Sequence, residues 1–172
     1  AAEQGGSQAL RNVGQAYLSY LAPVGTGLQV DFGKFVTPVG YEVAKTKDDW
    51  NYSRSLLLAV AIPRYHAGVR ATYRLNDEVT LAGFLVNGWN DVVDNNTGKT
   101  VAGQATVNLG HLTLVETYMG GPEQPNDNSV WRHLSDTVVR YAVTPQISAA
   151  ASHRFPTRSA SKKRGVSTTS HR

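Results

Sequence analysis

The sequence predicts an all-β protein, an antiparallel up-and-down meander that forms part of a transmembrane β-barrel. Apolar and polar residues alternate with period two along most of the chain, which is typical of strands with two unlike faces. Short and long connections follow one another between these strands, as in outer-membrane barrels. The longest apolar run, residues 56–62, has seven residues, whereas a transmembrane helix needs about 20.

The clearest strand covers residues 64–75. Every second side chain is apolar or aromatic, and those between them are basic, polar or glycine. One face carries Tyr65, Ala67, Val69, Ala71, Tyr73 and Leu75, and the other carries Arg64, His66, Gly68, Arg70, Thr72 and Arg74. Such strict alternation predicts a strand with one face in an apolar environment and the other in water.

Weaker alternation predicts further strands, for about eight in all. They cover residues 13–21, 27–36, 78–89, 100–109, 112–119, 134–144 and 146–152. The two faces separate well within 101–109 and 137–143, whereas the faces of 78–89 stay open.

The connections between these strands support the meander. Three long connections, at residues 37–63, 90–99 and 120–133, alternate with short ones at 22–26, 76–77, 110–111 and 145. Turn-forming residues mark the short connections, among them Pro23, Asn76, Gly110 and Pro145. We therefore expect tight turns at one end of the barrel and long loops at the other.

The basic charge of the chain lies at its C-terminal end. Six of the 17 Lys and Arg residues lie between Arg154 and Arg172, where there is no Asp or Glu. The remainder has 11 basic and 13 acidic residues, so the main body is close to neutral and indicates no nucleic-acid partner. We expect an N-terminal segment (1–12), the barrel strands and loops (13–152), and a basic tail (153–172) that is disordered or not native.

Aromatic residues lie where a membrane barrel would need them. Tyr65 and Tyr73 are eight residues apart, about 26 Å along a strand. With a tilt of roughly 40° this projects to about 20 Å, near the spacing of two aromatic girdles. We expect Tyr65, Val69, Tyr73 and Tyr141 to face lipid.

Four motifs in order give the chain a family resemblance. They are residues 33–42 (GKFVTPVGYE), 51–55 (NYSRS), 62–68 (IPRYHAG) and 86–90 (VNGWN) running on to 93–99 (VDNNTGK). In these pieces the chain resembles the OmpL-like β-barrel porins, over roughly residues 10–152. The likeness ends after about Ala151, where further amphipathic strands would be expected, so we expect a partial chain.

The resemblance implies a bacterial outer-membrane barrel, larger than eight strands in the full protein, with a water-filled lumen. It implies a channel for passive diffusion of small hydrophilic solutes, and outer-membrane lipid and the barrel-assembly machinery as partners. A homo-oligomer is left open. The alternative is a soluble or periplasmic β-barrel or sandwich that binds a small ligand, with its tyrosines inward and its arginines in bulk water.

The arginine face of residues 64–75 is the first candidate site. Unpaired guanidinium groups cannot sit in a dry core, so these side chains must reach water. One hypothesis is that Arg70, Arg64 and Arg74 line the pore together with Lys34 and Arg140, and bias it toward anions. The other is that the arginines pair with Asp31, Asp77 or Glu116 and have no role in selectivity.

The long segment 37–63 is the second candidate site. It contains Asp48, Asp49, Trp50 and Arg54, the side chains we expect to narrow the channel if this loop folds inward. The alternative is an external loop that packs on its neighbours.

No catalytic motif was found. The sequence has no nucleophile elbow, zinc-protease motif, phosphate loop or dinucleotide fingerprint, and no cysteine. His66, His111 and His133 are isolated from other catalytic residue types and are expected at the surface or in the lumen. We expect no enzymatic activity, no cofactor and no metal.

Overall fold

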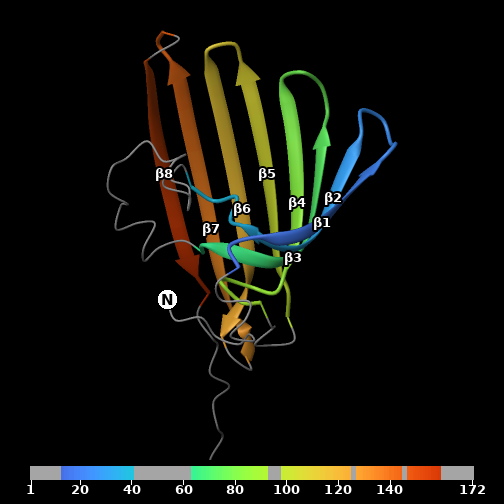
Figure 1. Ribbon diagram of the computed structural model, residues 1–172. Helices are drawn as coiled ribbons and strands as arrows, with labels where there is room; N and C mark the ends of the chain where they lie inside the picture. The colour runs from blue at the N-terminus through green and yellow to red at the C-terminus, as the bar shows by residue number, and fades with distance from the viewer. Residues whose placement is uncertain (1–12, 41–62, 93–97, 125–126, 145–146, 160–172) are drawn as a thin grey trace, which may run out of the picture.

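The computed structural model describes residues 13–40, 63–92, 98–124, 127–144 and 147–159. In this part of the chain eight strands form a single antiparallel sheet in sequence order (Figure 1). They are β1 (Ala16–Ala22), β2 (Leu28–Val36), β3 (Tyr65–Arg74), β4 (Val79–Val86), β5 (Thr100–Leu109), β6 (Leu112–Gln124), β7 (Asp127–Ala142) and β8 (Ser148–Arg158). The described residues include no helix that could cross a membrane. The predicted all-β meander is therefore confirmed.

The connection between β6 and β7 differs from the prediction. Residues 120–133 were expected to form a long loop, but the two strands stay paired through Pro122↔Trp131 to Gln124↔Asp127, with a register shift after Pro122. The glycines and proline that indicated a loop serve close packing instead. A Cβ at Gly121 would lie 2.6 Å from Cα of Thr100 on the neighbouring strand, so only glycine fits there.

Strand β8 is longer than predicted. It pairs with β7 as far as Arg132↔Arg158, six residues beyond the expected boundary at Ser152. The basic composition after residue 152 indicated a tail, but Arg154 has a buried carboxylate partner on β7, which sequence composition cannot reveal. Residues 160–172 lie outside the described part.

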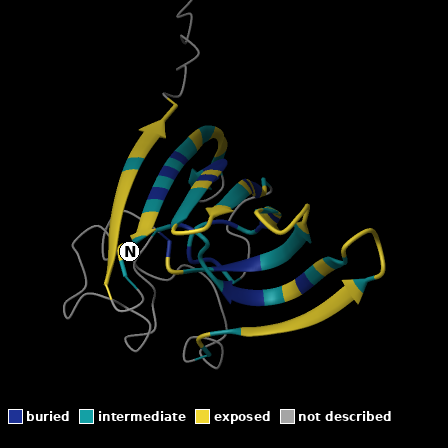
Figure 2. Ribbon diagram, turned by 90° about the horizontal axis from the view of Figure 1, so that it is seen from above, coloured by how far each residue is buried: buried dark blue, intermediate teal, exposed yellow. Residues whose placement is uncertain are grey.

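The sheet curls along its width, so that it has a concave and a convex face (Figure 2). It is open, with β1 and β8 at its edges. Glycines allow the backbones of neighbouring strands to approach each other closely near the middle of β2 and β3. Gly33 and Gly68 are directly paired and have φ of 142° and 156°, and a Cβ at Gly68 would lie 2.7 Å from Cα of Val86.

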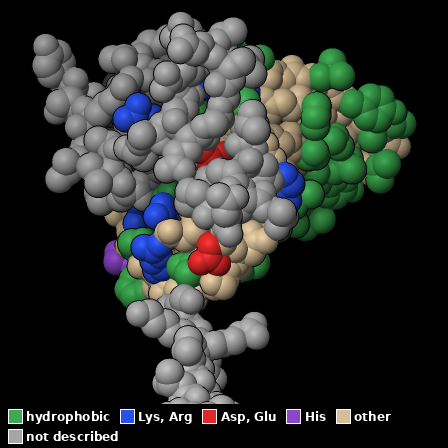
Figure 3. All heavy atoms as spheres, turned by 90° about the horizontal axis from the view of Figure 1, so that it is seen from below, with side chains coloured by type: hydrophobic (Ala, Val, Ile, Leu, Met, Phe, Trp, Pro, Cys, Tyr) green, Lys and Arg blue, Asp and Glu red, His purple; other side chains and the backbone are tan. Residues whose placement is uncertain are grey.

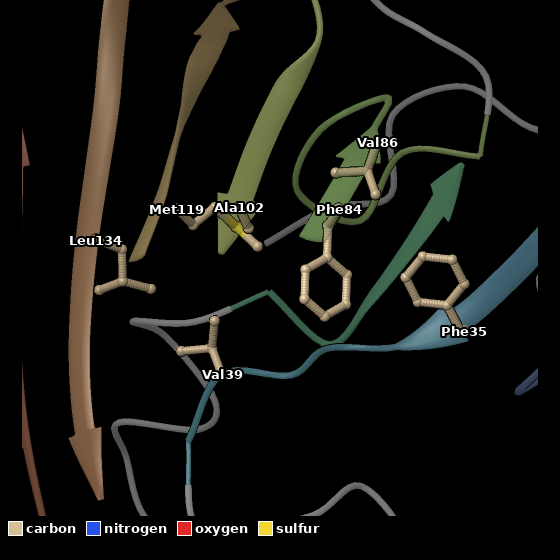
Figure 4. Close-up of a cluster of buried hydrophobic side chains, with 7 residues drawn as sticks. All are labelled: Phe35, Val39, Phe84, Val86, Ala102, Met119 and Leu134. Carbon is tan, nitrogen blue, oxygen red and sulfur yellow. The ribbon is translucent and has the colours of Figure 1, made fainter. Parts of the chain in front are cut away.

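Apolar side chains occupy both faces, in different ways. A buried cluster lies on the concave face (Figure 4). Its members are Phe35, Val39, Phe84, Val86, Ala102, Met119 and Leu134. On the convex face large apolar side chains stay exposed, among them Leu18 at 76% and Phe32 at 67%. Hydrophobic side chains gather over one side of the described surface, away from a histidine and several Lys and Arg (Figure 3).

Candidate functional site

Residues 37–40, which we call the inner strap, cross the concave face directly after β2. Val39 at the middle of the strap is buried and points toward Phe84 and Leu134 of the cluster (Figure 4). The strap begins beside β3, where the Thr37 backbone N–H donates to the Arg64 carbonyl at 3.1 Å. Residues 37–40, the described start of the predicted long connection, therefore lie against the concave face.

Three polar side chains from different strands hold the inner strap. The ring Nε2 of His66 on β3 lies 3.2 Å from Thr37 Oγ1. The amide of Gln104 on β5 donates to the Pro38 carbonyl at 2.9 Å. The Gly40 backbone N–H donates to Asp136 Oδ2 on β7 at 2.8 Å. The strap is thus anchored across most of the width of the sheet.

Asp136 joins the strap to the last strand. Its other carboxylate oxygen accepts from Arg154 Nε at 2.5 Å, and both side chains are almost fully buried, with 1% and 7% exposed. A buried ion pair is stable only while both partners are present and hydrogen-bonded. The pair therefore ties β7, β8 and the strap into one unit.

Beside the strap the concave face borders a half-open cavity of about 480 Å³. Half of its described lining residues are polar side chains from β3–β7. These are Arg70, Thr72, Thr80, Gln104, Thr106, Asn108, Thr113 and Arg140. Among the described lining residues there are two arginines and no Asp or Glu, so the charge that the wall presents to water is positive.

Arg70 lies between this cavity and a buried carboxylate. Its Nε and Nη2 both donate to Asp31 Oδ2, at 2.8 and 2.6 Å. Asp31 is completely buried and also accepts from Ser19 and Gln29, whereas the Arg70 side chain is 23% exposed. The ion pair proposed in the alternative hypothesis thus exists, yet solvent in the cavity meets the guanidinium and not the carboxylate.

The other predicted lining residues lie elsewhere. Arg64 is exposed ahead of β3, and Arg74 pairs at the turn with Asp77 at 2.8 Å, both outside the cavity wall. Lys34 lies on the convex face, where it pairs with Ala67 and places its ammonium 3.9 Å from the Tyr65 ring centroid. Lys34 was predicted to join the arginine row but lies on the opposite face, because it stands three positions from Asp31 on the same strand and alternate side chains point to opposite faces.

The residues expected to face lipid all lie on the convex face. Val69 is flanked there by Phe32 and Leu85. Tyr73 and Tyr141 lie near the tight turns, and Tyr65 lies at the opposite end of β3. The Tyr65 hydroxyl donates to the Asn90 carbonyl at 2.5 Å, which fits a rim position where one end of the ring finds polar partners.

The residues predicted to narrow the channel are not the described residues that anchor the inner strap. Asp48, Asp49, Trp50 and Arg54 lie outside the described residues. The sequence did not indicate His66, Gln104 or Asp136 as anchors. His66 and Gln104 lie on the polar side of their strands, whereas Asp136 shares its face with the buried Leu134 and Val138. The side of the strand on which a residue lies can be predicted from sequence alternation, but no local pattern indicates which of these residues contacts the strap.

A second cluster lies at the loop end of the sheet. Glu123 accepts from the Thr100 hydroxyl at 2.6 Å and from the Trp89 backbone N–H at 2.9 Å. Its neighbours are Asp91, which is buried, and Arg132. Glu123 is the twelfth residue of β6, beyond the 9–11 residues that a membrane strand needs. Burial raises its pKa to about 7, with Asp91 adding to the increase.

We expect that His66→Ala loosens the inner strap. The His66 ring is fully buried, and its Nδ1 lies 2.9 Å from the Gly88 carbonyl while its Nε2 contacts Thr37. Loss of the ring leaves a cavity and two unsatisfied groups, so the free energy of unfolding should fall by about 2–4 kcal/mol. Urea unfolding in lipid vesicles measures this. His111→Ala, at an exposed turn, is the control, and an equal effect of the two would contradict the prediction.

An antiparallel meander whose curved inner face borders a partly polar cavity, and whose outer face exposes apolar side chains, is the construction of a transmembrane β-barrel. The family model described as "Putative beta-barrel porin-2, OmpL-like" matches residues 2–171. The chain belongs to this family of outer-membrane β-barrel porins, and the match includes the basic C-terminal residues. Neither the curated proteins nor the solved structures include a match to the chain.

Proposed function

We propose that the chain forms the wall of a channel for passive diffusion of small hydrophilic solutes, with a preference for anions. Solute would pass along the concave face beside the inner strap, which narrows the path. Outer-membrane lipid would cover the apolar convex face, and the barrel-assembly machinery would insert the chain.

One observation carries the preference for anions. The described cavity wall has Arg70 and Arg140 but no carboxylate, and two carboxylates on the same face, Asp31 and Asp136, are buried and paired with arginines. A permeating ion would therefore meet guanidinium groups first. Rings of basic side chains are a recurrent basis of anion selectivity in pores.

The soluble alternative fits these observations less well. It required tyrosines inside and arginines in bulk water, whereas Tyr73 lies on the convex face and Arg70 on the concave one. Exposed side chains such as Leu18, Phe32 and Leu85 would leave a large apolar surface in water.

Reversing one charge of the cavity wall tests the proposal. Arg140 is exposed and lines the cavity. Arg140→Glu changes its charge by two units, and each unit charge at about 4 Å in water contributes about 1 kcal/mol. The ratio of anion to cation permeability should therefore fall by at least about thirtyfold. The reversal potential across a planar bilayer in a salt gradient gives this ratio.

Arg64→Glu is the matched control, because Arg64 is an exposed arginine outside the cavity wall. An equal shift in both variants would show that surface charge, not the cavity wall, sets the selectivity. A chain that remains monomeric and folded in plain buffer would refute the channel itself.

A further inference from the structure

The convex face changes character between β5 and β6. One row of paired residues reads Leu28, Tyr73, Leu81 and Ala105 on β2–β5, and continues as Glu116, Thr137 and His153 on β6–β8. The next row reads Val30, Ala71, Gly83 and Gly103, and continues as Tyr118, Ser135 and Phe155. At mid-strand this face is therefore apolar on β2–β5 and carries polar side chains on β6–β8, whereas nearer the tight turns Leu114 and Val139 keep β6 and β7 apolar.

The polar side chains at mid-strand on β6–β8 are organised by hydrogen bonds. We call them the polar patch: Glu116, Tyr118, His133, Ser135, Thr137 and His153. Glu116 accepts from Ser135 Oγ at 2.8 Å and from Thr137 Oγ1 at 2.5 Å. The Tyr118 hydroxyl lies 2.8 Å from His133 Nδ1. Even so, Glu116, Tyr118 and His153 remain exposed.

Glu116 lies too deep along its strand to be surrounded by lipid headgroups. It is the fifth residue of β6, about 13 Å along the strand from the tight turn. With a strand tilt of about 40° this is about 10 Å of depth, well inside an apolar band about 25 Å tall. A carboxylate and the imidazole of His153 in the same row need polar partners at that depth, because hydrocarbon offers none.

We propose that the polar patch is the contact between two copies of this chain in the membrane, an inference that rests on the proposed channel. The patch has a carboxylate on β6 and an imidazole on β8, with Thr137 of β7 between them. A two-fold axis along the membrane normal, passing at Thr137, turns the β6 side of one copy toward the β8 side of the other. Each carboxylate then approaches an imidazole of its partner, so the surface complements itself.

Single cysteines test the contact directly, because the chain contains no cysteine. Thr137→Cys should form a disulfide-linked dimer when outer membranes are oxidised. Ala71→Cys, which faces outward at mid-strand on the apolar part of this face, should stay monomeric. Thr137→Trp should convert the purified protein in detergent from dimer to monomer by mass, and Ala71→Trp should not.

The possible results distinguish a failure of the proposed dimer contact from a failure of the proposed channel function. Absence of a cross-link at residue 137, together with a monomeric mass for the unchanged chain in detergent, overturns the contact. Anion-selective conductance from such a monomer leaves the proposed function standing. Equal cross-linking at residues 71 and 137 also overturns the proposal, since it indicates random collision.

Discussion

Asp136→Ala is expected to lower the free energy of unfolding by about 3–5 kcal/mol and to enlarge the conducting path. The substitution leaves the guanidinium of Arg154 buried without its carboxylate, and breaking a buried pair from one side costs this much. It also removes the acceptor for the Gly40 N–H, so the inner strap loses its attachment to β7. Urea unfolding in lipid vesicles and single-channel conductance report the two effects separately.

Two comparisons make the Asp136 prediction specific. Asp77→Ala breaks an exposed pair with Arg74, and such pairs contribute only about 0–1 kcal/mol. Asp136→Leu combined with Arg154→Met replaces the buried pair with apolar side chains, and should recover most of the stability while leaving the strap loose. If Asp136→Ala were no worse than Asp77→Ala, the anchoring role of Asp136 would be refuted.

The stability of the loop end should fall as pH rises through the range in which Glu123 ionises. Its pKa is about 7 in the folded chain, chiefly because of burial, against 4.5 as the ordinary value. The folded state therefore holds a proton that the unfolded state has lost between these pH values. Stability is greatest below pH 4.5, declines toward pH 7, and is lower by about 3 kcal/mol above it.

Glu123→Gln tests this dependence, because glutamine preserves the acceptor for Thr100 and Trp89 and cannot ionise. Unfolding free energies at several pH values should show a much shallower slope between pH 4.5 and 7. Asp91→Asn removes the neighbouring negative charge, which adds to the raised pKa of Glu123, so the decline should end at a lower pH. A slope unaffected by Glu123→Gln would assign the dependence to another group.

Much of the fold is visible in local patterns. Period-two alternation identified eight strands, and in residues 64–75 it also separated the convex side chains, such as Val69 and Tyr73, from the concave Arg70. This works because successive side chains of a strand point to opposite faces, so the assignment needs only neighbouring residues. The same alternation places Lys34 on the convex face, since it lies three positions from Asp31. Its prediction as a lining residue was therefore inconsistent with the pattern of its own strand.

Local composition predicted the structure less well where a glycine, a proline or a charged side chain makes a contact with a distant part of the chain. Gly121 and Pro122 indicated a loop but lie in a paired strand, where Gly121 packs against Thr100. Arg154 indicated a solvated tail but forms a buried pair with Asp136. In each case the local preference is smaller than the packing or pairing energy that the tertiary contact supplies.

Local sequence patterns are sufficient to predict the strand class, the order of the meander and the two unlike faces that lipid and lumen require. Tertiary contacts alone establish where residues 37–40 lie, which arginines reach the cavity, and that a polar patch lies at mid-strand on the outward face of β6–β8. The physical reason is the separation along the chain of the residues that interact. Alternation is a property of adjacent residues, whereas the contact of Gly40 with Asp136 joins residues 96 positions apart and exists only once the sheet has curved.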